Sequence, residues 1–354
     1  MMRLLLAIDT PRFQDEAGTW RAIAKELLDA GIEQVHLLAD AGDAAPQPVL
    51  LEGVESLTTK LPPAWWHRRR TAHRLTHQID ELGIDVLLAS GPAAVASLIP
   101  VRNQLDIPLL VDVWRHEQIG TIDSIRADVW LARSEALADA LRKGIEHGTV
   151  VTTRSPIAQQ SVTRMPDKRP SLVVLDPGSR PRDWEPILHA LTDVLESRPD
   201  LECFMELRSD RSHRLWRQLR QRGLLERVSV EPTAGPLEQL VAAATMVAAP
   251  DPAMPCRTIV SSSMAGGAVL LAASNQNDDL IRHEDTAVVV DEATGTAWTH
   301  AMESILQDPQ RRHDLSRHAI AALEAAARYE TAIPAWITAI GSAAAPASYP
   351  LGAS

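Results

Sequence analysis

The chain has 354 residues, of which 45% are hydrophobic and 23% charged, and its formal net charge is −11. This length predicts about two domains with sizeable cores. The acidic balance argues against a broad nucleic-acid surface but leaves room for a local basic pocket. The two cysteines, Cys203 and Cys256, lie far apart, so neither a disulfide framework nor a metal site is expected.

The N-terminal run MMRLLLAIDTP is too short in its apolar part for a signal peptide or a membrane span, and it predicts a first strand. We expect no later segment to cross a bilayer. Together with the cysteine content, this predicts a protein of the reducing cytoplasm and leaves open peripheral contact with the inner membrane face.

Strand-like and helix-like segments alternate in the first half of the chain. This order predicts a parallel sheet with crossover helices. Residues Asp9–Gly18 are expected to form a loop, and Asp40–Pro48 a second one. The expected strands are Arg3–Ile8, Gln34–Leu38, Asp85–Ala89, Ile107–Val113 and Asp128–Ala132, and the expected helices are Thr19–Ala30, Ala64–Leu82, Ala93–Gln104 and Ser134–Lys143.

A polar stretch with two prolines, Ser161–Pro170, predicts an interdomain linker. A second alternating series follows it. Its expected strands are Leu172–Leu175, Glu202–Glu206, Val228–Val230 and Met246–Ala249, its expected helices are Asp183–Glu196, Ser212–Arg222 and Leu237–Ala243, and Asp278–Arg282, Ala287–Val290, Thr296–Leu306, Gln310–Ala327 and Thr331–Ile340 complete the series.

The most informative stretch is Ala249–Ala273, APDPAMPCRTIVSSSMAGGAVLLAA. Its first prolines end a strand, and Pro255 is tolerated in the first turn of a helix because its missing N–H would be unpaired there. The helix Pro255–Ala265 is closed by Gly266-Gly267, since glycine accepts the left-handed C-cap geometry. The apolar run Ala268–Ala273 predicts a buried parallel strand.

This stretch resembles the donor-binding segment of retaining glycosyltransferases of family 4, which have the GT-B fold. Their pattern is a Glu followed, eight positions later, by Glu-Ala-Met-Ala-x-Gly. Here Ser263–Gly267 takes the place of Ala-Met-Ala-x-Gly, and the glutamates fall on Met254 and Ser262. A Ser hydroxyl can still bond a ribose oxygen, whereas a Met thioether cannot replace a carboxylate. The resemblance implies donor contacts from Gly178, Met254, Ser261, Ser262, Ser263 and Met264.

Weaker sequence similarities, in the expected order, extend the resemblance over most of the chain. It implies an α/β protein with two Rossmann-like domains whose parallel sheets face each other across a cleft. We expect an acceptor-side domain at 1–160, a linker at 161–170, a donor domain at 171–328, a crossover helix at 329–342 and a flexible tail at 343–354.

A GT-B enzyme must stabilise a diphosphate leaving group with positive side chains and helix N-termini. The family uses an Arg and a Lys in the loop after the first strand of the second domain. Arg182 falls at the Lys position, and Arg180 is the candidate second cation. An Arg holds phosphate through a planar fork rather than as a point charge. The alternative is a pair of solvated loop arginines.

Two further groups of residues each have a functional and a structural interpretation. His116 and Arg115 follow a strand end where α/β proteins bind ligands, near the family's His position, although lone histidines are usually structural or solvated. The run Trp65–Arg70 could bind an acidic or lipid-linked acceptor or a membrane surface, or it forms a solvated helix face. Two departures also stand out: Leu207–Asp210 has no glycine, and Asp9–Gly18 lacks the family's paired glycines.

The sequence therefore predicts a metal-independent transferase that moves a hexose from a UDP or GDP sugar to a hydroxyl acceptor with retention. Arg182, Arg180 and His116 are its candidate catalytic residues. The nucleotide sugar is the donor substrate rather than a cofactor, and the acceptor is a glycan, a lipid-linked sugar or a small molecule. The alternatives are a non-catalytic binding or assembly partner, favoured by Met254 and Ser262, and a nucleotide-sugar epimerase, whose usual acid and base residues find no match.

Overall fold

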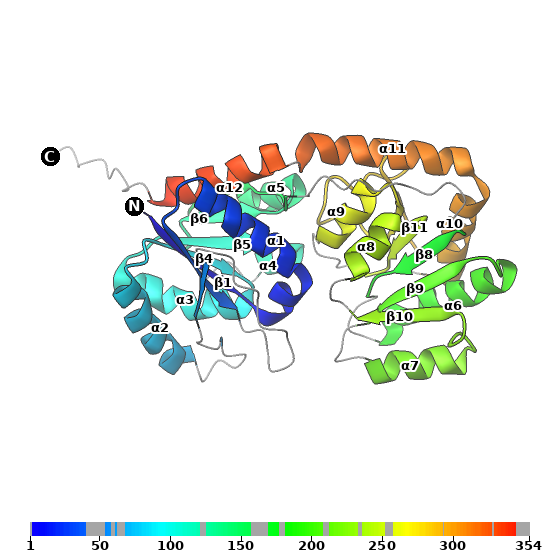
Figure 1. Ribbon diagram of the computed structural model, residues 1–354, viewed down its shortest axis with the longest axis horizontal. Helices are drawn as coiled ribbons and strands as arrows, with labels where there is room; N and C mark the ends of the chain where they lie inside the picture. Colours follow the sequence, from blue (N-terminus) through cyan, green and yellow to red (C-terminus); the bar gives the residue numbers. More distant parts are fainter. Residues whose placement is uncertain are drawn as a thin grey trace. The chain divides into compact units, whose positions relative to one another are not determined.

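The computed structural model (Figure 1) describes residues 2–39, 54–57, 61, 68–120, 125–156, 169–176, 181–207, 212–232, 236–251, 258–292, 294–327 and 329–344. The chain divides into two units, each with its own sheet. The first contains residues 1–113, 118–156 and 330–354, and the second contains 114–117 and 157–329.

The first unit has a seven-stranded parallel sheet in the order β3-β2-β1-β4-β5-β6-β7. Helices connect most of its neighbouring strands, as parallel pairing requires, and the connection from β2 to β3 lies outside the described residues. Its elements are β1 (Arg3–Ile8), α1 (Thr10–Asp29), β2 (Gln34–Ala39), β3 (Val54–Ser56), α2 (Arg68–Leu82), β4 (Val86–Ser90), α3 (Pro92–Leu105), β5 (Leu109–Val113), β6 (Val129–Ala132), α5 (Glu135–Gly144), β7 (Thr149–Thr152) and α12 (Tyr329–Ala344).

The main core of this unit lies between the sheet and two helices from opposite ends of the chain. Alternate residues of β1, Leu4, Leu6 and Ile8, pack with Trp20 of α1 and Trp336 of α12. Figure 1 shows α1 and α12 on the same side of the sheet. The last described helix is therefore part of the first unit's core.

The expected loop at Asp9–Gly18 is wrong, because α1 begins directly after β1, at Thr10. Pro11 lies in the first turn, where its fixed φ favours a helix start and its missing N–H is not needed. The helical backbone is interrupted at Glu16, with φ −137° and ψ 29°. The helix expected from Thr19 is thus the second part of a longer, kinked element.

The second unit has a six-stranded parallel sheet in the order β10-β9-β8-β11-β12-β13. Helices cover both faces, and each face has its own apolar cluster. Its elements are α4 (His116–Ile119, which begins in this unit), β8 (Ser171–Val174), α6 (Pro181–Ser197), β9 (Glu202–Leu207), α7 (Ser212–Gln221), β10 (Val228–Pro232), α8 (Pro236–Ala243), β11 (Met246–Ala249), α9 (Thr258–Ala265), β12 (Val269–Ala272), β13 (Ala287–Val289), α10 (Gly295–Gln307) and α11 (Pro309–Ala326).

The fold class expected from the sequence, two α/β domains with parallel sheets, is confirmed. The sequence did not predict β3, β7 or α4, which are short and carry little periodic signal. The expected loop at 40–48, the start of the expected helix at 64 and most of the expected linker lie outside the described residues.

The C-terminus of α9 depends on both of its glycines. The N–H of Gly267 bonds the carbonyl of Met264, and the N–H of Ala268 bonds that of Ser263, each at 2.9 Å. This is a Schellman C-cap, and Gly267 has the positive φ, +79°, that it requires. Gly266 meets a different constraint: a Cβ there would lie 2.2 Å from the carbonyl oxygen of Ala242 in α8.

We predict that Gly266→Ala destabilises the protein by about 2 kcal/mol or more, because backbone atoms of α8 must move to admit the methyl group. Gly341→Ala in α12 is the matched control, since a Cβ there meets nothing within 4 Å. Chemical denaturation compares the two. Equal stability of both variants would contradict the close approach of α8 and α9.

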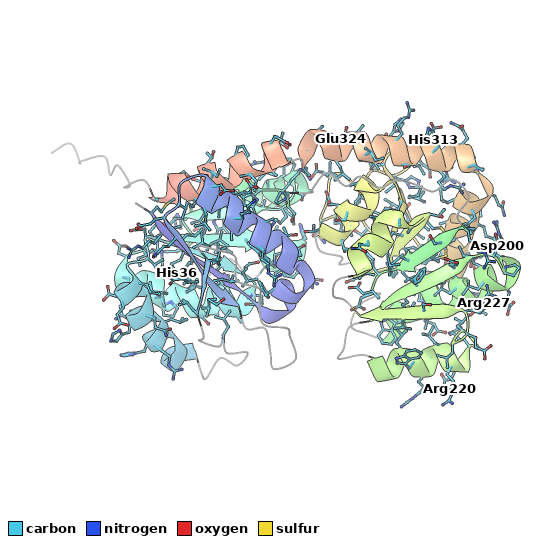
Figure 2. The ribbon with its side chains drawn as sticks, viewed as in Figure 1. His36, Asp200, Arg220, Arg227, His313 and Glu324 are labelled. Atoms are coloured by element: carbon cyan, nitrogen blue, oxygen red, sulfur yellow. The ribbon has the colours of Figure 1, made fainter. Side chains whose placement is uncertain are left out.

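His36 on β2 is a fully buried titratable group of the first unit (Figure 2). Its Nδ1 lies 3.4 Å from a carboxylate oxygen of Glu55 on β3. Burial lowers the pKa of His36, and this effect outweighs the opposing influence of the Glu55 charge. The folded protein therefore holds a neutral imidazole at a pH where an unfolded chain, with a His pKa of about 6.5, begins to take up a proton.

This difference predicts that acid weakens the first unit. As pH falls below about 6.5, the unfolded chain binds a proton that the folded chain does not, so the free energy of unfolding decreases by at most about 1.4 kcal/mol per pH unit. Urea denaturation at about pH 7.5 and 5.5 should show a smaller decrease for His36→Leu than for the unmodified chain. His77→Leu, at a side chain that is 68% exposed, should behave like the unmodified chain. If the free energy of unfolding of His36→Leu decreased as much as that of the unmodified chain, His36 would not be the group that makes the first unit sensitive to acid.

Candidate functional site

In an open parallel sheet, ligands bind beyond the carboxyl ends of the strands where the strand order reverses, because the neighbouring loops diverge there. This switch point lies between β1 and β4 in the first unit and between β8 and β11 in the second. Different groups lie at these two switch points.

At the second unit's switch point, two helices begin where strands end. α6 starts at Pro181 after β8, and α9 starts at Thr258 after β11. The free N–H groups and dipole of a helix N-terminus attract anions. Residues 177–180 and 252–257, which include Gly178, Arg180 and Met254, flank this point in the sequence but lie outside the described residues.

Arg182 is the second residue of α6. A positive side chain in the first turn of a helix is unfavourable unless an anion shares the site, because the N-terminal dipole end has the same sign. Its side chain lies outside the described residues, so the helical position alone is established. That position is on the side of the sheet that holds the carboxyl ends of the strands, where the sequence predicted a phosphate contact.

The other predicted donor contacts differ in exposure. Ser262 is 3% exposed, and Met264 belongs to the apolar core at 1%. Ser263 is fully buried, and its hydroxyl donates to the carbonyl of Val260 at 2.7 Å. Ser261 is half-buried and has the most accessible side chain of the four.

Glu206, at the end of β9, was missed by the sequence analysis. It is 1% exposed, and its Oε2 accepts the N–H of Asp176, just after β8, at 2.8 Å. It therefore fixes the start of the segment between β8 and α6, which contains Gly178 and Arg180. An acidic residue closing an apolar strand was the available signal.

His116 begins the short helix α4, and its side chain is exposed. Its backbone N–H donates to Oδ1 of the buried Asn277 at 2.7 Å, which joins Trp114–Glu117 to the second unit. The guanidinium of Arg115 lies over the ring of Trp114, 4.6 Å from its centroid. These contacts give Arg115 and His116 structural partners, and the catalytic role of His116 stays a prediction.

At the first unit's switch point, the carboxylate of Asp9 fills the N-terminus of α3. It accepts N–H groups from Ala93 at 2.9 Å and Ala94 at 2.6 Å. Gly91, with φ +101°, admits it: a Cβ there would lie 2.4 Å from the Asp9 Cγ. Burial raises the pKa of Asp9, and the two N–H groups oppose this. The chain's own anion thus occupies a position that could otherwise hold a ligand anion.

Beside Asp9 lies a network of fully buried charges centred on Asp112 of β5. Its carboxylate accepts from Arg133 Nε at 2.5 Å and Nη2 at 3.2 Å, and from the Ser90 hydroxyl at 2.6 Å. Arg12 Nε lies 4.0 Å from the same carboxylate, and Arg12 Nη2 lies 2.7 Å from Glu16 Oε2. Two cations and two anions balance, as buried charges require.

Aromatic rings hold Arg133 in place within this network. Its guanidinium lies 4.9 Å from the ring centroid of Trp20 and 4.6 Å from that of Trp336. The two indoles meet edge to face at 5.9 Å. The Trp336 N–H donates to the carbonyl of Arg154 at 3.1 Å. The network therefore connects the strand edge to α1 and α12, which fits a structural role.

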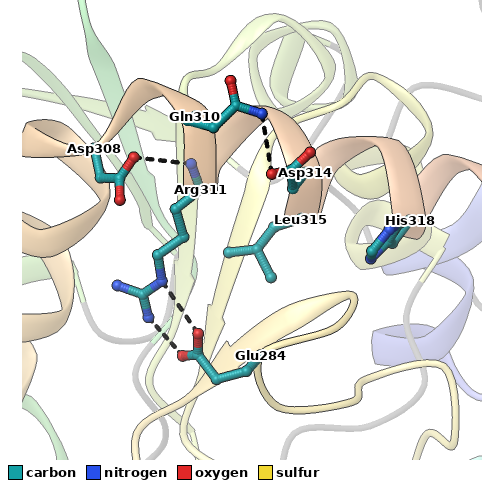
Figure 3. A pocket seen from close by; sticks show the side chains of 7 residues that line it. All are labelled: Glu284, Asp308, Gln310, Arg311, Asp314, Leu315 and His318. Atoms are coloured by element: carbon teal, nitrogen blue, oxygen red, sulfur yellow. Dashed lines mark hydrogen bonds and ion pairs between the residues drawn. The ribbon is translucent and has the colours of Figure 1, made fainter.

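One open pocket of about 370 Å³ lies along α11 (Figure 3). Its charged groups already pair with one another or with neighbours: Arg311 with Glu284, and His318 Nδ1 with Asp285 at 3.0 Å. Glu284 has a positive φ of 57°. This pocket belongs to the contact of α11 with the turn before β13 rather than to the β8/β11 switch point.

The described residues contain no group of three or more His, Cys, Asp or Glu side chains placed to hold a metal ion. Within the same part of the chain, no helix has the length and apolarity to cross a membrane.

Comparison with known proteins identifies the fold. No protein-family model and no curated protein sequence matches the chain. A glycosyltransferase from Rickettsia africae matches with a TM-score of 0.75 and 11% identity over 98% of this chain and 99% of that chain. Anabaena Alr3699/HepE with UDP and glucose matches with 0.74 and 17% over 97% and 100%. A sucrose-phosphate synthase from Thermosynechococcus elongatus matches with 0.75 and 13% over 94% and 97%.

These similarities extend over nearly the whole length of each chain, and both parallel sheets are included. The chain has the GT-B fold of glycosyltransferases. At this level of identity the likeness establishes the architecture, and the reaction has to be argued from the site.

The charge network makes a testable prediction. Asp112→Ala leaves two buried guanidinium groups without their shared carboxylate, and we expect a loss of about 3–5 kcal/mol in the free energy of unfolding. The control is Asp139→Ala, which removes one of the two exposed carboxylate partners of Arg142 and should cost less than about 1 kcal/mol. Urea denaturation followed by circular dichroism measures both. Similar losses in the two variants would show that the network contributes little.

Proposed function

We propose that this chain is a glycosyltransferase that takes a sugar from a UDP or GDP sugar and transfers it to a hydroxyl acceptor. The observation that carries the proposal is the β8/β11 switch point, where α6 begins after β8 and α9 begins after β11. Arg182 is the second residue of α6. A crystallised protein of the same fold, Alr3699/HepE, was captured with UDP and glucose.

In this proposal, the residues at the β8/β11 switch point stabilise the diphosphate leaving group. Negative charge grows on the phosphate oxygens as the glycosidic bond breaks, and preorganised positive groups lower the barrier. The N–H groups at the starts of α6 and α9 supply fixed dipoles, and Arg182 and Arg180 supply the side-chain charge. These cations take the role that a divalent ion has in other transferases. Retention at the anomeric carbon is proposed from the resemblance to family 4.

The Ser261 hydroxyl is the most accessible of the predicted serine contacts and is the candidate partner for a nucleotide hydroxyl. The first unit is proposed to bind the acceptor. His116 is kept as a candidate near the reacting sugar, and Trp65–Arg70 as a candidate acceptor or membrane contact.

The second candidate is a non-catalytic binding or assembly protein with the same architecture. Met254 and Ser262 favour it, because neither supplies the carboxylate of an active family 4 site. The buried Glu206 also favours it, because a carboxylate next to a diphosphate repels it and occupies the N–H of Asp176.

Calorimetry with UDP and GDP tests the donor site. We predict binding of at least one at micromolar to millimolar concentration, and a loss of about 10-fold or more in Arg182→Ala, which removes a charge-assisted phosphate contact. Arg198→Ala is the matched control, because Arg198 follows the other end of α6 and pairs with Asp200. Failure of both nucleotides to bind, or an equal effect of the two substitutions, would contradict the proposal.

Placing the two family 4 glutamates in this chain distinguishes the transferase from the non-catalytic protein. If the chain is a transferase with an altered donor site, it turns over a nucleotide sugar as it stands, and Met254→Glu with Ser262→Glu raises turnover by less than about 10-fold. Release of UDP or GDP from a panel of nucleotide sugars provides the measurement. An inert native chain that the double substitution makes active would instead support the non-catalytic candidate.

A further inference from the structure

One segment of this acidic chain is strongly basic. Residues 208–227 contain seven arginines and no lysine, against Asp210 and Glu226 as the acidic residues. The segment includes α7, which joins β9 to β10 in the second unit. Such a local reversal of charge needs an explanation, because the chain as a whole carries −11.

Two of these arginines have internal roles. Arg222 pairs with Glu185 of α6. Arg227 donates to the carbonyls of Leu195 at 3.1 Å and Arg198 at 3.3 Å, which closes the C-terminus of α6. They stabilise the unit and need no outside partner.

The exposed side of α7 is different. An α-helix turns about 100° per residue, so Trp216, Arg220 and Arg217 share an arc of about 100°. Leu215 and Leu219, on the other side of the helix, are buried in the core. Arg217 and Arg220 are exposed, and no ion pair to them is present among the described residues. Figure 2 shows Arg220 extending from α7 away from the sheet.

Trp216 is the apolar member of this α7 face, which we define as Trp216, Arg217 and Arg220. It is 43% exposed, and in the described part of the chain it is the one large apolar side chain classed as exposed. An indole next to guanidinium groups fits a boundary between apolar and charged surroundings.

We propose that the α7 face docks on an anionic phospholipid bilayer. Arg217 and Arg220 contact headgroup phosphates, and the Trp216 ring lies at the level of the headgroups. Guanidinium forks match phosphate geometry, and Trp is favoured at membrane interfaces. Arg214, on the same helix, adds to the basic character of the segment.

A bilayer fits this face better than a protein partner. A stable protein interface buries about 800 Å² on each side around an apolar centre. The α7 face offers a single exposed apolar side chain, which is too little for such a centre. Apart from Arg222 and Arg227, the segment 208–227 has five arginines. Clusters of about four to eight basic residues bind anionic membranes, and an interfacial aromatic side chain adds to such weak, reversible binding.

Co-sedimentation of the full chain with vesicles tests this docking. Vesicles of phosphatidylcholine alone are compared with vesicles containing about one third phosphatidylglycerol, at about 0.1 M salt. We expect binding to the anionic vesicles only. Arg217→Glu with Arg220→Glu should weaken it by about 30-fold or more, since each basic residue near an anionic surface contributes about 5-fold. Trp216→Ala should weaken it several-fold, while Arg217→Lys with Arg220→Lys keeps most of it.

The matched control is Arg142→Glu with Arg317→Glu, the same charge change at exposed arginines on other helices; its binding should be unchanged. Equal binding to neutral and anionic vesicles, or an equal loss in the control, overturns the proposal. A third outcome also overturns it: the chain fails to bind vesicles but binds a single-stranded DNA probe, and substitutions at the α7 face abolish the DNA binding. Sugar transfer is not measured, so failure here is independent of failure of the proposed function.

Discussion

Every strand in each sheet runs in the same direction, and this constraint decides where the chemistry of the chain is placed. Parallel strands joined by crossover helices bring all strand ends and all following helix N-termini to one edge of a sheet. Unpaired N–H groups and positive dipole ends gather there, so the edge attracts negative charge. Each unit of this protein must satisfy that edge, either with its own anions or with those of a ligand.

The first unit satisfies it internally. Asp9 fills the N-terminus of α3, and Asp112 holds Arg133 between two indoles. Burying such a balanced network is costly, and its worth lies in holding α1 and α12 against the sheet. In the second unit, Glu206 of β9 accepts the N–H of Asp176, which follows β8, and Asp251 follows β11. We propose that the N-termini of α6 and α9 at the β8/β11 edge take an external diphosphate.

The sequence was sufficient for the parts of the fold that depend on local pattern. Apolar runs and glycine caps predicted the parallel strands and the end of α9, where Gly267 adopts the left-handed φ. It failed where distant contacts decide. Asp9–Gly18 looked like a loop because proline and polar residues mask a helix start. Asp112 of β5 and Arg133, which follows β6, are 21 residues apart, and no local pattern predicts their pairing. The burial of Ser263 follows from packing against other helices, which one helix cannot reveal.

We propose above all that the second unit binds a nucleoside diphosphate at its β8/β11 edge. A crystal structure of the full chain grown with UDP or GDP tests this most directly. We expect diphosphate density at the N-termini of α6 and α9, with the Arg182 guanidinium bonded to a phosphate oxygen. A nucleotide bound elsewhere, or an edge that stays closed by the chain's own side chains at saturating nucleotide, would contradict it.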